Sequence, residues 1–143
     1  MTVNAILNEK GRNVVTANKE DTLSDICAAL AQNRIGAIVV VDSDSNVRGI
    51  ISERDIVRAL ARHGNDALKK QAAMFMTENV ITCSGAETIA DLMAKMTKGK
   101  FRHLPVVESG KLAGIVSIGD VVKWRIAEAE FEARAMREYI ATG

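Results

Sequence analysis

The same pattern of residues occurs twice in the chain, at a nearly constant spacing. The segment 14–16 (VVT) returns 66 positions later at 80–82 (VIT), and 49–55 (GIISERD) returns 65 positions later at 114–120 (GIVSIGD). The one-residue change of spacing falls in the polar turn that begins at Asp42. Duplicated folding units tolerate insertions in turns, so we expect two copies of one unit related by a pseudo-two-fold axis. Ligands of such modules bind in the crevice between the two halves.

The composition is that of an ordinary globular protein. A chain of 143 residues forms one domain or two half-domains with a shared core, and 48% apolar with 26% charged residues is typical of this class. A net charge of +1 gives no reason to expect nucleic-acid binding. No apolar run reaches the roughly 18 residues of a membrane helix, and the N-terminus has no apolar signal core. With two cysteines, Cys27 and Cys83, the sequence is consistent with a reducing cytoplasm.

Each copy is predicted to fold as strand, helix, strand, strand and helix, which places the chain in the α/β class. Apolar residues at helical spacing, such as Leu23, Ile26 and Leu30, predict helices, and an unbroken apolar run predicts a buried strand. The elements expected in the first copy are 14–16, 22–33, 38–41, 47–51 and 55–63. Those expected in the second copy are 80–82, 87–98, 104–107, 112–116 and a helix that begins at 120.

These elements divide the chain into four parts. The first repeat spans 5–63, a connecting segment 64–79, the second repeat 80–125 and a C-terminal helical extension 126–143. The spacing of Leu68, Ala72 and Met76 predicts one or two helical turns in the connecting segment.

One long helix is predicted from Asp120 to Ala141, because this segment contains neither Pro nor Gly. It has two apolar stripes on nearly opposite faces, which indicates that it lies between two surfaces. We therefore predict a symmetric homodimer in which Trp124 or Phe131, together with Met136 and Ile140, meet the second subunit. The alternative is a helix buried within a single chain. The first stripe comprises Val122, Ile126, Ala129, Ala133, Met136 and Ile140, and the second Trp124, Ala127, Phe131 and Ala135.

The repeated motifs resemble those of tandem CBS domains, the regulatory pairs named after cystathionine β-synthase and often called Bateman modules. The resemblance rests on the hydrophobic–hydrophobic–Thr segment, the apolar segment 104–107 (LPVV) and the Gly-h-h-Ser-x-x-Asp junction, each present twice and covering about 5–125. One departure is that Pro105 has no counterpart in the first copy, where 38–41 reads IVVV. The resemblance implies a tandem CBS pair with an extended C-terminal helix.

The Ser-x-x-Asp junctions have two interpretations. Ser52 with Asp55, and Ser117 with Asp120, stand where a strand passes into a helix, where a hydroxyl and an acid three residues later form a capping box. The same helix end attracts phosphate, and a carboxylate there accepts hydrogen bonds from ribose hydroxyls. The resemblance to CBS pairs implies that each Asp anchors the ribose of a ligand.

The resemblance also implies two pockets, each of which combines strands of one repeat with the Ser-x-x-Asp of the other. The first pocket is rich in cations suited to phosphate oxygens, whereas the second is nearly neutral. In the alternative interpretation, the charges at Lys100 and Arg102 are solvated loop residues. The first pocket would comprise Thr82, Arg102, His103, Ser52, Arg54 and Asp55, and the second Thr16, Gly36, Ala37, Ser117, Gly119 and Asp120. Further candidates beside them are Ile35, Ile38, Lys100, Phe101, Pro105 and Ile118.

No catalytic constellation is present in the sequence, so we do not expect an enzyme. A metal site is not expected either, because His103 and His63 have no further ligands at metal spacing. The resemblance implies a stand-alone regulatory protein that binds an adenine nucleotide (AMP first; ADP, ATP or NAD as alternatives) and senses energy or redox state. Its partners would be a second copy of the chain and an unidentified effector protein, with neither nucleic acid nor membrane. The competing hypothesis is a structural dimerisation module with vestigial clefts.

Overall fold

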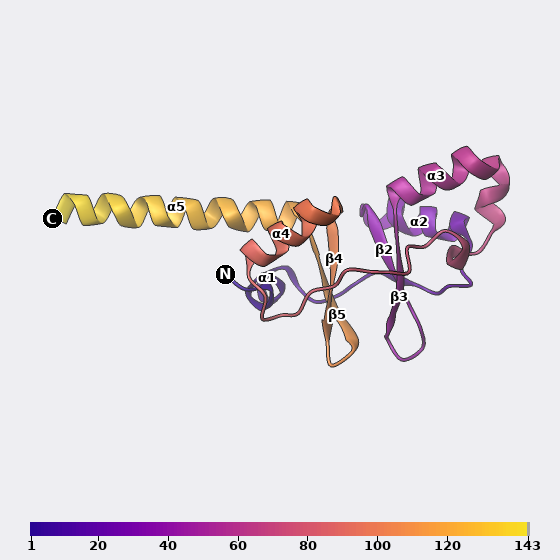
Figure 1. Ribbon diagram of the computed structural model, residues 1–143, viewed down its shortest axis with the longest axis horizontal. Helices are drawn as coiled ribbons and strands as arrows, with labels where there is room; N and C mark the ends of the chain where they lie inside the picture. The colour runs from indigo at the N-terminus through magenta and orange to yellow at the C-terminus, as the bar shows by residue number, and fades with distance from the viewer. Residues whose placement is uncertain (143) are drawn as a thin grey trace.

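A computed structural model describes residues 1–142 and consists of two α/β halves followed by a long helix (Figure 1). The predicted α/β class with an extended C-terminal helix is confirmed. The predicted extension at 126–143 includes Gly143, which lies outside the described residues. The first half contains β1 (Thr16–Ala17), α2 (Leu23–Asn33), β2 (Ala37–Val41), β3 (Val47–Ser52) and α3 (Glu53–His63). The second half contains α4 (Ile89–Gly99), β4 (His103–Glu108), β5 (Lys111–Ser117) and α5 (Ile118–Thr142).

Equivalent helices of the two halves begin with the same local device. Thr22 caps α2 and Thr88 caps α4, and in both cases an Asp three residues later closes a capping box. Both helices end at a residue in the left-handed conformation, Arg34 and Lys100 respectively. These polar residues and their spacing explain why the ends of both helices were predicted from the sequence to within two residues.

The first strand is where the two halves differ. In the first half β1 runs parallel to β2, with Thr16 opposite Val39, and it begins two residues later than predicted. The prediction of a strand at 80–82 is wrong. In the described chain, the sheet of this half consists of β4 and β5, and the segment before α4 contacts β4 by a single bridge between Cys83 and Val106. The counterpart of Val39 is Pro105, which has no N–H to donate to a neighbouring strand, and this limits the pairing.

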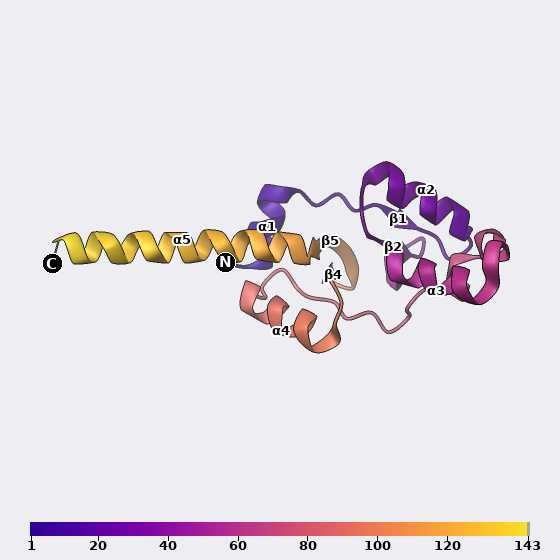
Figure 2. The ribbon, with the colours of Figure 1, turned by 90° about the horizontal axis from the view of Figure 1, so that it is seen from above.

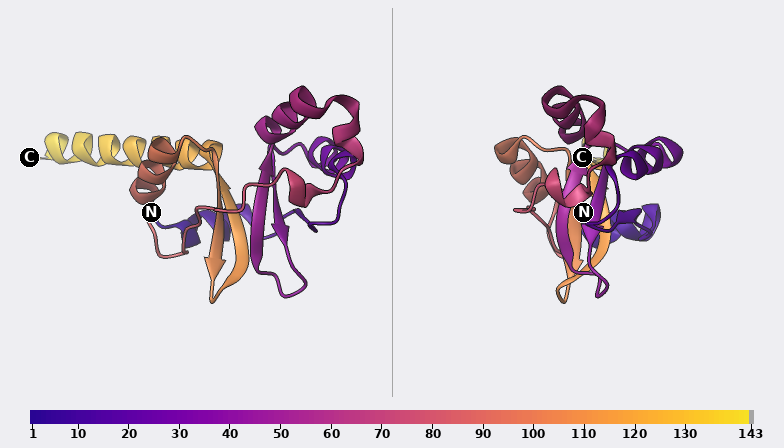
Figure 3. Two further views of the ribbon diagram at one scale, coloured as in Figure 1. Left: turned by 45° about the vertical axis from the view of Figure 1, so that its right-hand side comes forward. Right: turned by 90° about the vertical axis from the view of Figure 1, so that its right-hand side faces the viewer.

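Each half is completed by a segment from elsewhere in the chain. The helix α1 (Val3–Lys10), which the sequence analysis did not predict, buries its apolar side in the core of the second half. The connecting segment folds as two short 3₁₀ helices, η1 (Gly64–Lys69) and η2 (Ala72–Met74), and packs on the core of the first half. Figures 2 and 3 show both covering segments.

Equivalent glycines make room for these covering segments. A Cβ atom at Gly49 would lie 2.6 Å from Sδ of Met76, and a Cβ atom at Gly114 would lie 2.8 Å from Cδ2 of Leu7. The glycine that recurs in the repeat therefore marks a close approach of side chain to strand.

The helix α5 is attached to the body only by its first turns. Val121 is buried in the core of the second half and Trp124 packs against it. From residue 129 to residue 142 every side chain is exposed, and the helix projects away from both halves (Figures 1 and 2).

Candidate ligand-binding site

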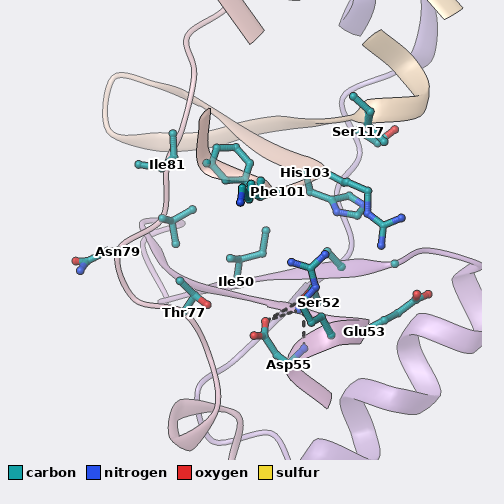
Figure 4. Close-up of a pocket in the computed structure, with 18 of the residues that line it drawn as sticks. Ile50, Ser52, Glu53, Asp55, Thr77, Asn79, Ile81, Phe101, His103 and Ser117 are labelled. Carbon is teal, nitrogen blue, oxygen red and sulfur yellow. Dashed lines mark hydrogen bonds between the residues drawn. The ribbon is translucent and has the colours of Figure 1, made fainter. Parts of the chain in front are cut away.

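A cavity of about 490 Å³ lies between the two halves. Figure 4 shows Phe101 and His103 on one side, Ser52 and Asp55 on the opposite side, and the connecting segment along a third. A volume of this size is typical of small-molecule pockets in proteins. The crevice that the internal repeat predicted is therefore present as a single continuous cavity.

The β-hairpins explain why these residues meet. Ala37 at the start of β2 pairs with Ser52 at the end of β3, and His103 pairs in the same way with Ser117. Outside the ladders, the N–H of Glu53 donates to the carbonyl of Gly36 at 3.0 Å, and the N–H of Ile118 donates to the carbonyl of Arg102 at 2.8 Å. Each half thus presents the beginning of one strand and the beginning of a helix to the same cavity.

Asp55 caps α3 and also lines the cavity. Its Oδ2 atom accepts hydrogen bonds from the N–H of Ser52 at 2.9 Å and from the Ser52 hydroxyl at 3.1 Å. Among residues 1–142, no hydrogen bond to the Oδ1 atom is formed. The two interpretations of the Ser-x-x-Asp motif are therefore compatible, because capping occupies one oxygen and leaves the other able to accept from a ligand.

Asp120 makes the same capping contacts but has an additional partner. Its Oδ2 atom accepts from the N–H of Ser117 at 2.9 Å and also from Nζ of Lys10 at 2.5 Å. Partial burial tends to raise the pKa of Asp120, but the hydrogen bonds from Lys10 and Ser117 outweigh it and hold that pKa below its usual range. Asp120 does not line the cavity.

The charged residues around the cavity are mostly cationic. Glu53 and Asp55 are the acidic side chains of the lining, against four basic ones: Arg54, Arg58, Lys100 and Arg102. Within residues 1–142 none of these four forms an ion pair, and all four are exposed. Cations without protein partners are available to phosphate oxygens, and the planar guanidinium groups suit them best.

His103 lies between these groups and the interior. Burial lowers its pKa first, and the nearby charges of Arg102 and Lys10 lower it further, whereas Glu53 and Asp120 partly oppose the effect. Its imidazole is therefore neutral at pH 7 and offers one N–H donor and one acceptor nitrogen to the cavity.

An apolar part of the cavity lies beside the connecting segment. Ile50, Val80, Ile81 and Phe101 contribute its side chains, and Thr77 and Asn79 flank it with polar groups (Figure 4). The cavity thus combines apolar side chains with a carboxylate and several guanidinium groups.

The structure places most of the predicted residues, including members of both predicted pockets, around this cavity. One cavity brings together Gly36, Ala37, Ser52, Arg54, Asp55, Lys100, Phe101, Arg102, His103, Ser117, Ile118 and Gly119. The predicted residues outside its lining are Thr16, Ile35, Ile38, Thr82, Pro105 and Asp120.

The residues outside the lining have other contacts. The side chain of Ile38 is buried in the core of the first half, and Ile35 packs against that core. Pro105 is buried in β4, and the carbonyl of Thr82 accepts from Lys95 at 2.9 Å. Side chains alternate along a strand, so consecutive residues such as Ala37 and Ile38 face opposite ways and do not line the same cavity.

Sequence reasoning missed several residues that line the cavity: Ile50, Glu53, Arg58, Thr77, Asn79, Val80, Ile81 and Gly99. Arg58 could have been found, because it follows Arg54 by four residues on α3 and lies on the same helix face. Val80 and Ile81 belong to the repeated segment 80–82, of which only Thr82 was predicted as a site residue, whereas 77–79 carries no comparable signal.

Two further properties concern the described chain as a whole. Residues 1–142 contain no group of three or more His, Cys, Asp or Glu side chains arranged to hold a metal ion. Over the same range, no helix has both the length and the apolar composition needed to cross a membrane.

Comparison with known proteins identifies the repeat. The sequence model of the CBS domain matches residues 9–62 and again residues 72–127. The chain is 30% identical over 150 residues to the mitochondrial CBS domain-containing protein CBSX3 of Arabidopsis thaliana, covering 99% of this chain and 73% of that protein. It spans 19% of the length of a second Arabidopsis relative, CBSCBSPB2.

Solved structures of similar proteins have the same fold. The CBS-domain protein ATU1752 of Agrobacterium tumefaciens is 46% identical with a TM-score of 0.84, over 87% of this chain and 92% of that one. The CBS pair of MJ0100, in complex with methylthioadenosine and S-adenosylmethionine, is 27% identical with a TM-score of 0.80, over 90% and 98%. The protein PAE2072 of Pyrobaculum aerophilum, in complex with AMP, is 28% identical with a TM-score of 0.75, over 84% and 89%.

Proposed function

This chain belongs to the CBS-domain family, and we propose that it is a regulatory protein that binds an adenine nucleotide, AMP first, in the cavity between its halves. The observation that carries the proposal is the group of four unpaired basic side chains beside the free carboxylate oxygen of Asp55. Two similar CBS pairs hold adenosine compounds: AMP in PAE2072, and methylthioadenosine with S-adenosylmethionine in MJ0100. The excess of cations favours AMP, which carries a phosphate, over methylthioadenosine and S-adenosylmethionine, which carry none.

Each part of a mononucleotide has a matching part of the cavity. The base would lie against Ile50, Ile81 and Phe101, where apolar contact and stacking are available. The ribose hydroxyls would donate to Oδ1 of Asp55. The phosphate would lie near Arg54 and Arg102, so that its charge is matched by guanidinium groups.

A thermal-shift series with AMP, ADP, ATP, NAD and S-adenosylmethionine tests this function. A ligand that binds the native state raises the midpoint of unfolding by mass action, and at 100 times its Kd it adds about 2.7 kcal/mol to the stability. We expect AMP to give the largest shift and S-adenosylmethionine a smaller one. If none of the five shifts the midpoint at millimolar concentration, the chain is not a nucleotide sensor.

We propose further that the protein acts as a homodimer and transmits ligand binding to a separate effector protein, as a sensor of energy or redox state rather than as an enzyme. The exposed apolar side chains of α5 support self-association. The two unpaired cysteines, Cys27 and Cys83, are consistent with a reducing compartment such as the cytoplasm.

A purely structural dimerisation module is the second candidate function, and the exposed α5 is the observation that favours it. The two candidates differ in what they predict for the cavity. Four unpaired cations around one space repel one another, so in a module that binds no ligand they do not contribute to stability. Substitution of Arg54 and Arg102 by Met would leave a structural module unaffected or more stable, whereas it would abolish the AMP-dependent shift of a sensor.

A further inference from the structure

The exposed face of α5 has the spacing of a coiled-coil seam. Its apolar members follow one another at alternating steps of four and three residues, which is the 3.5-residue repeat that two supercoiled helices require. The bulky ones are 49% (Val122), 54% (Ile126), 59% (Met136) and 69% (Ile140) exposed. The seam consists of Val122, Ile126, Ala129, Ala133, Met136 and Ile140, with Ile126, Ala133 and Ile140 at the a positions and the other three at the d positions.

The seam points away from the body of its own chain. The body contacts α5 at Val121, at Trp124 and at Glu128, whose carboxylate lies 3.2 Å from the N-terminal amine. Successive residues of a helix are rotated by about 100° around its axis. The side of α5 that contacts the body and the side that carries the seam are therefore about 130° apart. Figures 1 and 2 show no element of the chain beside the projecting part of α5. Trp124 therefore packs on its own chain and does not face the seam.

We infer that α5 pairs with α5 of a second copy as a parallel, in-register, two-stranded coiled coil. The inference rests on the proposed homodimer and specifies its interface. A groove over Ala129 and Ala133 lets a second helix approach closely, and β-branched residues at a positions, here Ile126 and Ile140, are typical of two-stranded coiled coils.

The charges beside the seam are compatible with this orientation. In a parallel pair each g residue faces the e residue five positions later on the other helix. Arg125 then faces the partner's Glu130, and Glu132 faces the partner's Arg137. Two-fold symmetry doubles both contacts, so all four flanking pairs are between opposite charges.

No antiparallel arrangement both buries the whole seam and matches these charges. With full overlap of the seam, Glu130 would face the partner's Glu130, and Lys123 would face the partner's Arg137. A shift by one heptad in one direction keeps only the contact between Glu130 and the partner's Arg137 and leaves Val122 without a partner. A shift in the other direction forms two contacts between opposite charges, Lys123 with the partner's Glu130 and Arg125 with the partner's Glu132, but it leaves Met136 and Ile140 uncovered. The parallel arrangement buries the whole seam with opposite charges on both sides of it.

Cross-linking of the full-length chain tests the orientation. In a parallel, in-register pair the two copies of residue 136 are adjacent, so Met136→Cys is expected to form a disulfide-linked dimer under mild oxidation. Glu138→Cys, on the outer face, is the matched control, and the wild type accounts for Cys27 and Cys83. If Met136→Cys cross-links no better than Glu138→Cys, or if a mixture of Ala133→Cys and Met136→Cys chains cross-links preferentially, the parallel seam is wrong.

Charge reversal provides an independent test by sedimentation. Glu132→Lys and Arg137→Glu are each expected to weaken the dimer about tenfold, and the double variant to restore it, because both pairs are then reversed together. The two positions are five residues apart and do not face each other within one helix, so the rescue must come from the partner. Failure of the rescue would refute the parallel arrangement.

A third pair of variants separates the seam from the rest of the dimer. Met136→Asp is expected to shift the protein to monomer, whereas Phe131→Asp, on the opposite side of α5, is expected to leave it dimeric. A protein that stays dimeric with Met136→Asp dimerises elsewhere, which refutes this inference but not the proposed homodimer. A wild type that remains monomeric at about 100 μM, where any dimer with a Kd in the micromolar range would be populated, would refute both.

Discussion

Nζ of Lys10, at the end of α1, donates to the carboxylate of Asp120 at 2.5 Å and to the carbonyl of Ile115 at 2.9 Å. Asp55, the equivalent residue of the first repeat, has no such partner among residues 1–142. The duplication therefore produced two equivalent carboxylates, one open to the cavity and one held by a lysine. This difference assigns unequal roles to two residues that the sequence motif treats as identical.

The first prediction concerns these two carboxylates. Asp55→Asn is expected to weaken AMP binding by about 1.5–3 kcal/mol, because it replaces the charged acceptor of the ribose hydroxyls. Asp120→Asn, the matched control at the equivalent position, is expected to change AMP affinity by less than a factor of about 3. Isothermal titration calorimetry on both variants measures the difference. Equal losses at the two positions would mean that Asp120 also contacts the ligand.

The second prediction concerns the lysine. Lys10→Met is expected to lower the free energy of unfolding by about 1 kcal/mol at pH 7, because the ion pair is partly buried and joins α1 to the second half. The pKa of Asp120 lies below its ordinary value, so this stability is present above the unfolded pKa and is lost as the pH falls through the folded pKa.

Urea unfolding at pH 7 and at low pH tests this coupling. The difference between wild type and Lys10→Met should shrink as the solution is acidified towards the titration of Asp120. Lys19→Met changes an exposed lysine that forms no ion pair within residues 1–142, and it should leave the stability unchanged at both pH values. A difference that is independent of pH would indicate that Lys10 contributes by packing alone.

What the sequence predicted well was local. The helices α2 and α4 and the hairpins follow from residues within one element, such as Thr22 with Asp25, and the repeat supplied a second copy of each signal. The contact between Lys10 and Asp120 joins residues 110 positions apart, and no local pattern indicates it. The missing strand at 80–82 depends on the absent N–H of Pro105, whose effect appears only once the strands are placed side by side.

At the site, too, residues in a local motif could be predicted from the sequence, whereas the arrangement of the two halves could not. The motif residues Ser52 and Asp55 lie at the cavity, whereas Ile38, next to the lining residue Ala37 in sequence, and Pro105, two residues after the lining residue His103, are buried. Members of both predicted pockets line one cavity, because both strand-to-helix junctions contribute residues to it. Spacing along the chain does not report the angle between two half-domains.

The third prediction concerns the phosphate. Arg102→Met is expected to weaken AMP binding about fivefold to tenfold and to leave adenosine binding unchanged, because an exposed guanidinium contributes about 1 kcal/mol to an anion contact. Raising the salt concentration should weaken AMP binding in the wild type more than in the variant. Arg48→Met, in the distant β2–β3 hairpin where Arg48 pairs with Asp42, is the control. If adenosine loses as much affinity as AMP, Arg102 contacts the nucleoside rather than the phosphate.

The fourth prediction concerns His103 and protons. Burial, together with the charges of Arg102 and Lys10, keeps the pKa of His103 below its ordinary value in the free protein. A phosphate anion in the cavity favours the protonated imidazole, so the pKa of His103 is expected to rise when AMP binds. In the pH range between the free and bound pKa values the complex therefore takes up protons, and AMP affinity increases as the pH falls from 7.5 to about 6.5, close to the ordinary pKa of histidine.

Calorimetry in two buffers with different ionisation enthalpies measures this uptake directly. The observed binding enthalpy should differ between the buffers for the wild type, and the difference should largely disappear in His103→Asn. Adenosine, which lacks the phosphate, serves as the ligand control and should bind without proton uptake. The phosphate of AMP titrates near pH 6 on its own, and the comparison with His103→Asn separates that contribution from the imidazole. Equal proton uptake in wild type and His103→Asn would exclude His103 as the titrating group and place the phosphate away from it.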